Sequence, residues 1–145
     1  KFVSESTRTV RGYGFPINEE GTGATQLAIS SFHLEALLQE SDLLLDRGYL
    51  DLVVYSRFLD SIDESTISYI EGTWDRVKHY YTKYVYFPIE FKSVDDGVRS
   101  VNEDWRESID KEFVKELTAS GIDYLTVTGS PKQRVTQILK YIDKS

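Results

Sequence analysis

An acidic and a basic residue stand side by side where an apolar run of the sequence ends. Asp46 and Arg47 follow residues 42–45, which we expect to form a short buried strand. An Asp at such a strand end can hold Mg²⁺, and the neighbouring Arg can bind a phosphate with its planar fork of donors. The alternatives are a surface ion pair and an Asp that caps the next helix, and the two residues alone favour neither reading.

Two more acidic residues are candidates for the same site. Glu5 follows an expected strand end at residues 2–3, and a Glu that faces a cleft there can accept a proton from a substrate hydroxyl. Taken by itself, Glu5 is more simply expected to be a solvated surface residue. Arg8, three residues further on, is a candidate for substrate binding. Asp51 is another, although capping of the helix after Arg47 is the stronger expectation for it.

A pair of arginines lies far along the chain in a segment expected to be helical. Arg99 and Arg106 are seven residues apart, so they share one face of a helix. On a lid, that face can close over transferring phosphates and neutralise their charge. The alternative is a salt-bridged surface helix, because Glu103 is placed to pair with both arginines.

The elements that must position these residues alternate between strands and helices. Expected strands lie at 2–3, 42–45, 81–91 and 123–129, and expected helices lie at 24–40, 50–60, 64–80, 95–121 and from 131 onward. Gly121 is expected to cap a helix C-terminus, and Ser130 to cap the last helix ahead of Pro131. The glycine-rich residues 11–26 are expected to form a loop. This alternation predicts an α/β fold with a mostly parallel sheet covered by helices on both faces.

Such sheets bind ligands at the carboxyl ends of their strands. In this sequence those ends carry the charged or glycine positions Glu5, Asp46, Arg47, Glu90 and Gly129. His33 and His79 have no supporting spacing for metal binding or nucleophilic catalysis, so we expect both to be structural. The strand ends therefore remain the predicted site.

Length and composition limit the classes of protein to consider. The 145 residues suffice for one domain, and the absence of cysteine excludes disulfides and Cys-based zinc sites. Cysteine absence also fits a cytoplasmic protein. The chain has no apolar run of the roughly 20 residues that a membrane span needs. A formal charge of −7 repels nucleic acid, so a nucleic-acid partner is not expected and any anion site must be local.

The motifs together resemble a known family. "FVSESTR", "LLLDRGYLDLVVYSRFL", "DDGVRS" and "YLTVTGSPKQRV" are similar in order and spacing to segments of the P-loop nucleoside and nucleotide kinases. The resemblance points to the nicotinamide-riboside-kinase-like and AAA-type ATPase-like branch, often found in phages and bacteria, with thymidylate kinase more distant. It implies a single three-layer P-loop NTPase-like domain over residues 1–145, with a lid-like helical segment at about 93–110.

The resemblance also implies roles for individual residues. Glu5 would act as general base or position the acceptor hydroxyl, Asp46 would act near Mg²⁺, and Arg47 would bind phosphate. Arg99 and Arg106 would be the lid arginines. The family's loop past the adenine of ATP matches Gly129, Ser130 and Pro131, and its contacts to the acceptor's base match Gln26 and Phe32.

One departure from the family pattern is large. The family's phosphate-binding loop, G-x-x-x-x-G-K-S/T, is absent, since "GYGFPINEEGTG" does not end in Lys-Ser or Lys-Thr. In the family this loop follows the first strand, which lies centrally in the sheet between the third and the fourth. We therefore expect the first strand and the loop to precede residue 2 in the natural protein, and we expect no phosphoryl transfer from the 145 residues alone.

The sequence thus predicts an ATP- and Mg²⁺-dependent kinase of a small acceptor, most simply a nucleoside or nucleotide. Two alternatives stay open: a non-catalytic nucleotide- or protein-binding module with a degenerate kinase fold, and an ATPase without a phosphoacceptor. The expected partner is a small molecule, and because relatives are often dimers or tetramers, a homo-oligomer is possible.

Overall fold

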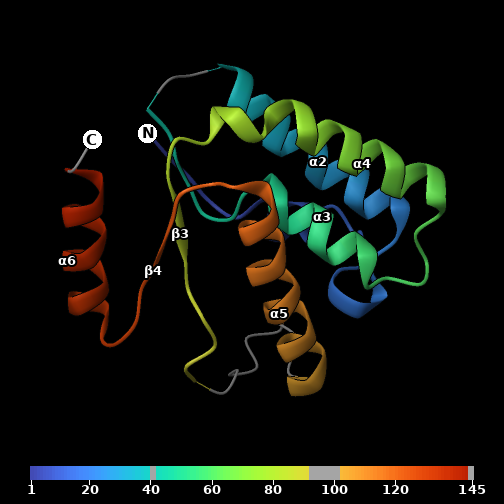
Figure 1. Cartoon of the computed structure of the whole chain (residues 1–145). Coiled ribbons are helices and arrows are strands. Elements are labelled where there is room, and N and C mark those ends of the chain that lie inside the picture. The colour runs from blue at the N-terminus through green and yellow to red at the C-terminus, as the bar shows by residue number, and fades with distance from the viewer. Residues whose placement is uncertain (40–41, 92–101, 144–145) are drawn as a thin grey trace.

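The computed structural model describes residues 1–39, 42–91 and 102–143 (Figure 1). The strands in these ranges are β1 (Phe2–Val3), β2 (Leu44–Leu45), β3 (Tyr84–Tyr86) and β4 (Tyr124–Thr126). The α-helices are α1 (Ser6–Gly12), α2 (Gly23–Gln39), α3 (Tyr49–Arg57), α4 (Glu64–Val77), α5 (Glu103–Ser120) and α6 (Pro131–Ile142), and two 3₁₀ turns are η1 (Asn18–Glu20) and η2 (Lys78–Tyr80). The predicted alternation of strands and helices is therefore present.

The strands form two separate parallel pairs. β1 pairs with β2, with Phe2 opposite Leu44, and β3 pairs with β4, with Tyr84 opposite Tyr124. The expected parallel direction is confirmed, whereas a single three-layer sheet is not, because β2 and β3 do not pair. The expected central strand would lie between β2 and β3, and no strand of the described residues lies there.

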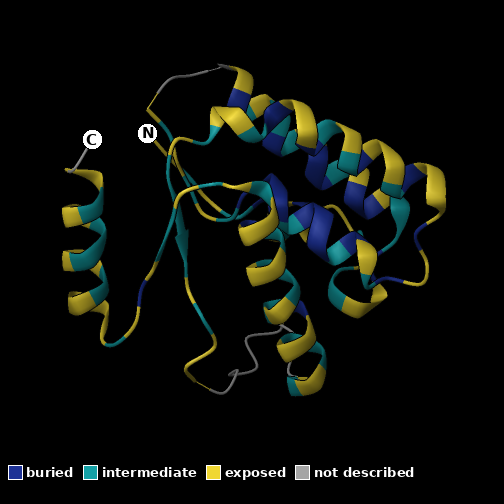
Figure 2. Ribbon diagram, viewed as in Figure 1, coloured by how far each residue is buried: buried dark blue, intermediate teal, exposed yellow. Residues whose placement is uncertain are grey.

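The core is formed by helices rather than by the strands. Helix α3 is buried along most of its length, from Tyr49 to Val54, and α2, α4 and α5 pack around it (Figure 2). Ile70 and Trp74 of α4 are fully or almost fully buried against it, as their helical spacing predicts. Burial of side chains this size contributes about 1.5–3 kcal/mol each. This cluster therefore stabilises helix α3, which follows the end of β2.

Helix α2 buries only part of the apolar stripe that its spacing predicts, which consists of Leu27, Phe32, Leu34, Leu37 and Leu38. Leu37 is buried and Phe32 and Leu34 pack against the core, whereas Leu27 and Leu38 are 41% and 63% exposed. The buried face also carries polar residues, among them Gln26, Ser30 and His33. Burial of such groups is tolerated where they find hydrogen-bond partners, and the Ser30 hydroxyl lies 2.8 Å from the Tyr49 hydroxyl.

Several local expectations need correction. Residues 11–26 are not all loop, because α1 runs to Gly12 and the turn η1 follows it. The strand expected at 42–45 has only two residues, and it is not fully buried, since Leu44 is 60% exposed. The strands expected at 81–91 and 123–129 are likewise only three residues long.

Other local expectations are confirmed. Gly121 ends α5 with a φ of +65°, a left-handed conformation that glycine adopts without a Cβ clash. Ser130 caps α6 by accepting a hydrogen bond from the Gln133 amide, and Pro131 begins the helix. In the described part of the chain, no helix has the length and apolar character needed to cross a bilayer.

Helices α5 and α6 lie on opposite sides of the β3–β4 pair (Figure 1). On the α5 side, the Tyr86 hydroxyl donates to Asp110 at 2.6 Å. On the α6 side, the Lys83 ammonium donates to the Tyr141 carbonyl at 3.3 Å. The lid-like segment expected at 93–110 is described only from residue 102, where Asn102 caps the start of α5.

Candidate functional site

Arg47 lies at the centre of a group of charged and polar side chains at the carboxyl ends of β1 and β2. Its Nε forms an ion pair with Glu5 Oε1 at 2.8 Å, and its Nη1 donates to Asp51 Oδ1 at 3.0 Å. Nη1 also donates to the Tyr55 hydroxyl at 3.3 Å, and the guanidinium lies 5.8 Å from the centre of the Tyr55 ring. One guanidinium thus joins the ends of two strands to helix α3.

The local backbone brings these groups together. The Asp46 amide donates to the Val3 carbonyl at 2.9 Å, so the ends of β1 and β2 lie side by side. Arg47 then adopts a φ of +71°, which is left-handed and unfavourable for a residue with a Cβ. Backbone strain of this kind concentrates at functional sites.

Asp51 has two structural tasks at this turn. Its carboxylate accepts a hydrogen bond from the Gly48 amide at 3.0 Å, at the start of α3, and its other oxygen binds Arg47. The expectation that Asp51 caps the helix is therefore confirmed. Nothing in the structure tests its candidate role in substrate binding.

The electrostatics leave Arg47 charged and partly available. Burial by itself lowers the pKa of Arg47, but the Tyr55 hydroxyl and the carboxylates of Asp51 and Glu5 outweigh it and raise that pKa above its usual value. The side chain is 34% exposed. Among the described residues, no hydrogen bond reaches its Nη2 group. A planar donor held on one side and open on the other suits a phosphate oxygen.

The outcome differs for the other acidic candidates. Glu5 is only 11% exposed, so the solvated reading is wrong, and its second oxygen lies 3.6 Å from Arg8 Nε. Asp46 does not pair with Arg47: its residue is exposed, and within the described ranges it takes part in no ion pair. The alternative of an ion pair between Asp46 and Arg47 is therefore wrong, and Glu5 is the residue that pairs with Arg47.

Asp46 remains the candidate for holding Mg²⁺. The described residues contain no cluster of three or more metal-ligating side chains. Mg²⁺ commonly keeps several waters and binds one or two carboxylates together with substrate phosphates. A single exposed carboxylate next to Arg47 fits that kind of site.

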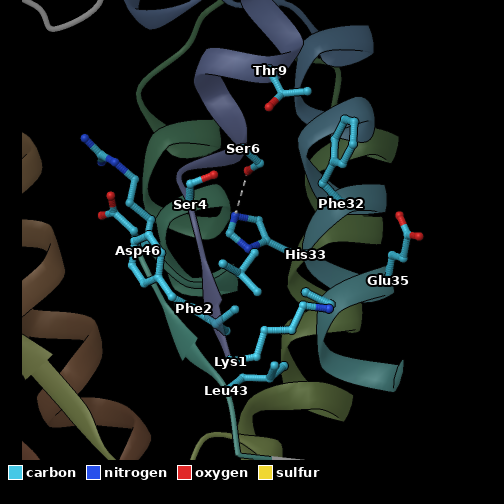
Figure 3. Close-up of a pocket in the computed structure, with 14 residues that line it drawn as sticks. Lys1, Phe2, Ser4, Ser6, Thr9, Phe32, His33, Glu35, Leu43 and Asp46 are labelled. Carbon is cyan, nitrogen blue, oxygen red and sulfur yellow. Dashed lines mark hydrogen bonds between the residues drawn. The ribbon is translucent and has the colours of Figure 1, made fainter. Parts of the chain in front are cut away.

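A pocket of about 350 Å³ opens beside β1 and α2 (Figure 3). Phe32, predicted to contact an acceptor base, lines it, together with Asp46 and Arg47. Gln26, predicted for the same role, does not, because its side chain is buried in the protein. The structure thus brings Phe32, but not Gln26, to a cavity near the strand ends.

His33 lines the same pocket, although sequence reasoning assigned it only a structural role. Its Nε2 lies 3.4 Å from the Ser6 hydroxyl, and both residues are buried (Figure 3). Burial is the main cause that lowers the pKa of His33 below its usual value. The signal for it was its position four residues from both Ile29 and Leu37, since residues at that spacing share one face of a helix and both of these are buried.

A second cluster lies at the carboxyl ends of β3 and β4. The Glu90 carboxylate accepts a hydrogen bond from the Gly129 amide at 3.0 Å and binds the Arg134 guanidinium. Arg134 Nε in turn donates to the Gly129 carbonyl at 2.8 Å. The turn of Gly129, Ser130 and Pro131 is therefore held in place at a strand end, and its predicted contact with adenine stays a prediction.

The predicted lid arginines have different outcomes. Arg106 donates to both carboxylate oxygens of Glu103 at 2.9 Å, which is the salt-bridged alternative. Arg99 lies outside the described residues. The neighbour of Arg106, Trp105, contacts the Tyr55 ring at 5.4 Å, so the first turn of α5 reaches the Arg47 group through aromatic side chains.

Parallel strand pairs with charged residues at their carboxyl ends are typical of nucleotide-binding α/β proteins. Comparison with known families identifies the class: a family model described as an AAA domain matches residues 20–134. The chain belongs to this family of P-loop NTPase-like proteins, whose function is of the nucleotide-binding, ATPase type. The matched range includes Arg47 and Gly129 but not Glu5. No curated protein and no solved structure matches the chain.

Proposed function

We propose that the protein transfers a phosphoryl group from ATP, with Mg²⁺, to a small acceptor, most simply a nucleoside or nucleotide. The observation that carries the proposal is the Glu5–Arg47 pair at the ends of two adjacent parallel strands. It supplies a carboxylate and a guanidinium that can donate hydrogen bonds to a phosphate at one place, and no hydrogen bond from the described residues reaches the Nη2 group of Arg47. Family membership supports nucleotide binding.

The residues would divide the reaction between them. Glu5 would accept the proton of the acceptor hydroxyl, and Arg47 would neutralise charge on the transferred group. Asp46 would hold Mg²⁺, which when bound draws the phosphate oxygens together and offsets their charge. Arg106 would add a second cation once it leaves Glu103. The turn at Gly129 would lie beside the adenine of ATP.

A phosphoryl-transfer assay tests this proposal. The whole natural chain that contains residues 1–145 is supplied with Mg²⁺, ATP and a panel of nucleosides and nucleoside monophosphates, and both ADP and phosphorylated product are measured. Glu5→Gln and Arg47→Lys should each lower kcat at least about a hundredfold. Arg57→Lys is the matched control, because Arg57 is also ion-paired but binds Glu71, Glu112 and Glu116 away from the site.

The result also separates the alternatives. ADP release that needs no acceptor and does not rise with any nucleoside would indicate an ATPase, the reading that the AAA family match favours. Neither ADP nor product would indicate a binding module. The natural chain around these residues gives a further check, since the kinase proposal requires a G-x-x-x-x-G-K-S/T loop in it and the module does not.

A further inference from the structure

Tyr55 of α3 contacts both the Arg47 group and helix α5. Its hydroxyl accepts a hydrogen bond from Arg47 Nη1 at 3.3 Å. Its ring lies edge-on to the Trp105 ring, with 5.4 Å between centres, and to the Phe113 ring, with 6.4 Å. Tyr55 is thus the side chain through which the guanidinium at the strand ends meets α5.

Helix α5 is fixed to its surroundings next to these contacts. Arg57, two residues after Tyr55, binds Glu112 at 3.1 Å and Glu116 at 2.8 Å. The Tyr86 hydroxyl holds Asp110 at 2.6 Å. The Arg57 ion pairs hold α3 against α5, and the Tyr86 bond holds α5 against β3. The Tyr55 ring is therefore packed in one position, and a ring held on two sides can orient the group that it binds.

The hydroxyl of Tyr55 differs in kind from the other two partners of Arg47. Glu5 and Asp51 are carboxylates, and a guanidinium with two such neighbours is drawn toward full pairing with them. A neutral hydroxyl can hold Nη1 in place without cancelling its charge. Glu5 holds Nε, while Asp51 and the Tyr55 hydroxyl hold Nη1, so the plane of the guanidinium is fixed. No hydrogen bond from the described residues reaches Nη2.

We propose that Tyr55 is a positioning residue, which sets the orientation of Arg47 toward a phosphoryl group and couples that orientation to Trp105 on α5. The nature of the bound group rests on the proposed function. Tyr55 itself is not expected to touch the substrate.

The kinetic test uses Tyr55→Phe, which keeps the ring and its packing and removes only the hydroxyl. In the phosphoryl-transfer assay, kcat should fall about tenfold, since one hydrogen bond to a charged group is lost, while the acceptor KM changes less than about twofold. Tyr69→Phe is the matched control, because Tyr69 is 50% exposed on α4. Equal activities of the two variants would overturn the proposal.

A second test needs no substrate. It shows whether Tyr55 couples Arg47 to Trp105 even when no acceptor is phosphorylated. Trp74 and Trp105 each give an indole N–H signal in a ¹⁵N–¹H NMR spectrum of the whole natural chain, and Trp74→Phe and Trp105→Phe assign the two signals. Arg47→Lys should shift the Trp105 signal and leave that of Trp74 in place. In a Tyr55→Leu background, the same change at Arg47 should leave both signals unmoved. The coupling would be refuted if Arg47→Lys left the Trp105 signal unshifted. It would also be refuted if Arg47→Lys shifted that signal equally in the wild type and in the Tyr55→Leu background.

Discussion

Replacement of Arg47 tests the geometry of the site through stability. Arg47→Ala leaves Glu5, which is only 11% exposed, without its nearest cation. Removing one partner of a buried ion pair costs about 3–5 kcal/mol. Because Arg47 is 34% exposed, water can replace part of the interaction. We therefore expect the free energy of unfolding to fall by about 2 kcal/mol.

Arg47→Gly separates the charge from the backbone. A non-glycine residue at a φ of +71° costs about 1–2 kcal/mol, and glycine relieves this strain in the folded state. The greater freedom of glycine in the unfolded chain offsets about 0.4–1 kcal/mol of that relief. Arg47→Gly should therefore be more stable than Arg47→Ala by about 0.5–1 kcal/mol. Urea unfolding followed by circular dichroism measures both variants.

The decisive comparison adds Glu5→Gln to each background. In the wild type this change breaks the ion pair and should destabilise the fold. In Arg47→Gly it removes a mostly buried charge that has lost its nearest cation and keeps only Arg8, at 3.6 Å, so it should restore stability, with a coupling energy of about 1–2 kcal/mol. If Glu5→Gln lowers stability equally in both backgrounds, the 2.8 Å pair contributes nothing and the reasoning is refuted.

Three other changes have defined outcomes. The pKa of His33 is lowered by burial, so its contribution to stability is complete above pH 6.5 and is lost as the pH falls below that value. His33→Gln should flatten the pH dependence of the free energy of unfolding in urea below pH 6.5, and His79→Gln should not. Asn102→Ala removes the acceptor for the Trp105 amide and should cost about 1 kcal/mol in thermal unfolding, while Ser108→Ala on the same helix should cost little. Arg57→Ala should cost about 1–2 kcal/mol, and a difference from wild type that does not shrink in 1 M NaCl would argue against an ionic cause.

The position of the candidate site could be predicted from the sequence better than the ion pairs within it. Glu5 and Arg47 could be predicted because charged residues directly after strands gather at one edge of a parallel sheet. The partner of Arg47 could not, because proximity in the sequence does not decide which carboxylate a long side chain reaches after a left-handed turn. Only the register of β1 on β2, a contact across some forty residues, brings Glu5 within reach.

The errors in the helices have a similar origin. Helix α1 was missed because Val10 is the only large apolar residue in it, so no periodic apolar pattern marks it. The inner face of α2 was predicted only in part, because a periodic pattern of apolar residues does not mark polar residues that are buried. Ser30 and His33 are buried there since Tyr49 and Ser6 provide hydrogen-bond partners, and those partners lie far away in the sequence.

The division of the strands into two pairs has a consequence for handling the protein. Each strand has a single neighbour among the described residues, so neither outer edge of a pair is covered by a further described strand. Exposed strand edges are templates for other chains, and natural proteins limit this hazard with short edge strands. Strands of two or three residues offer few such groups, so self-association of residues 1–145 should be weak, reversible and strongest at high concentration.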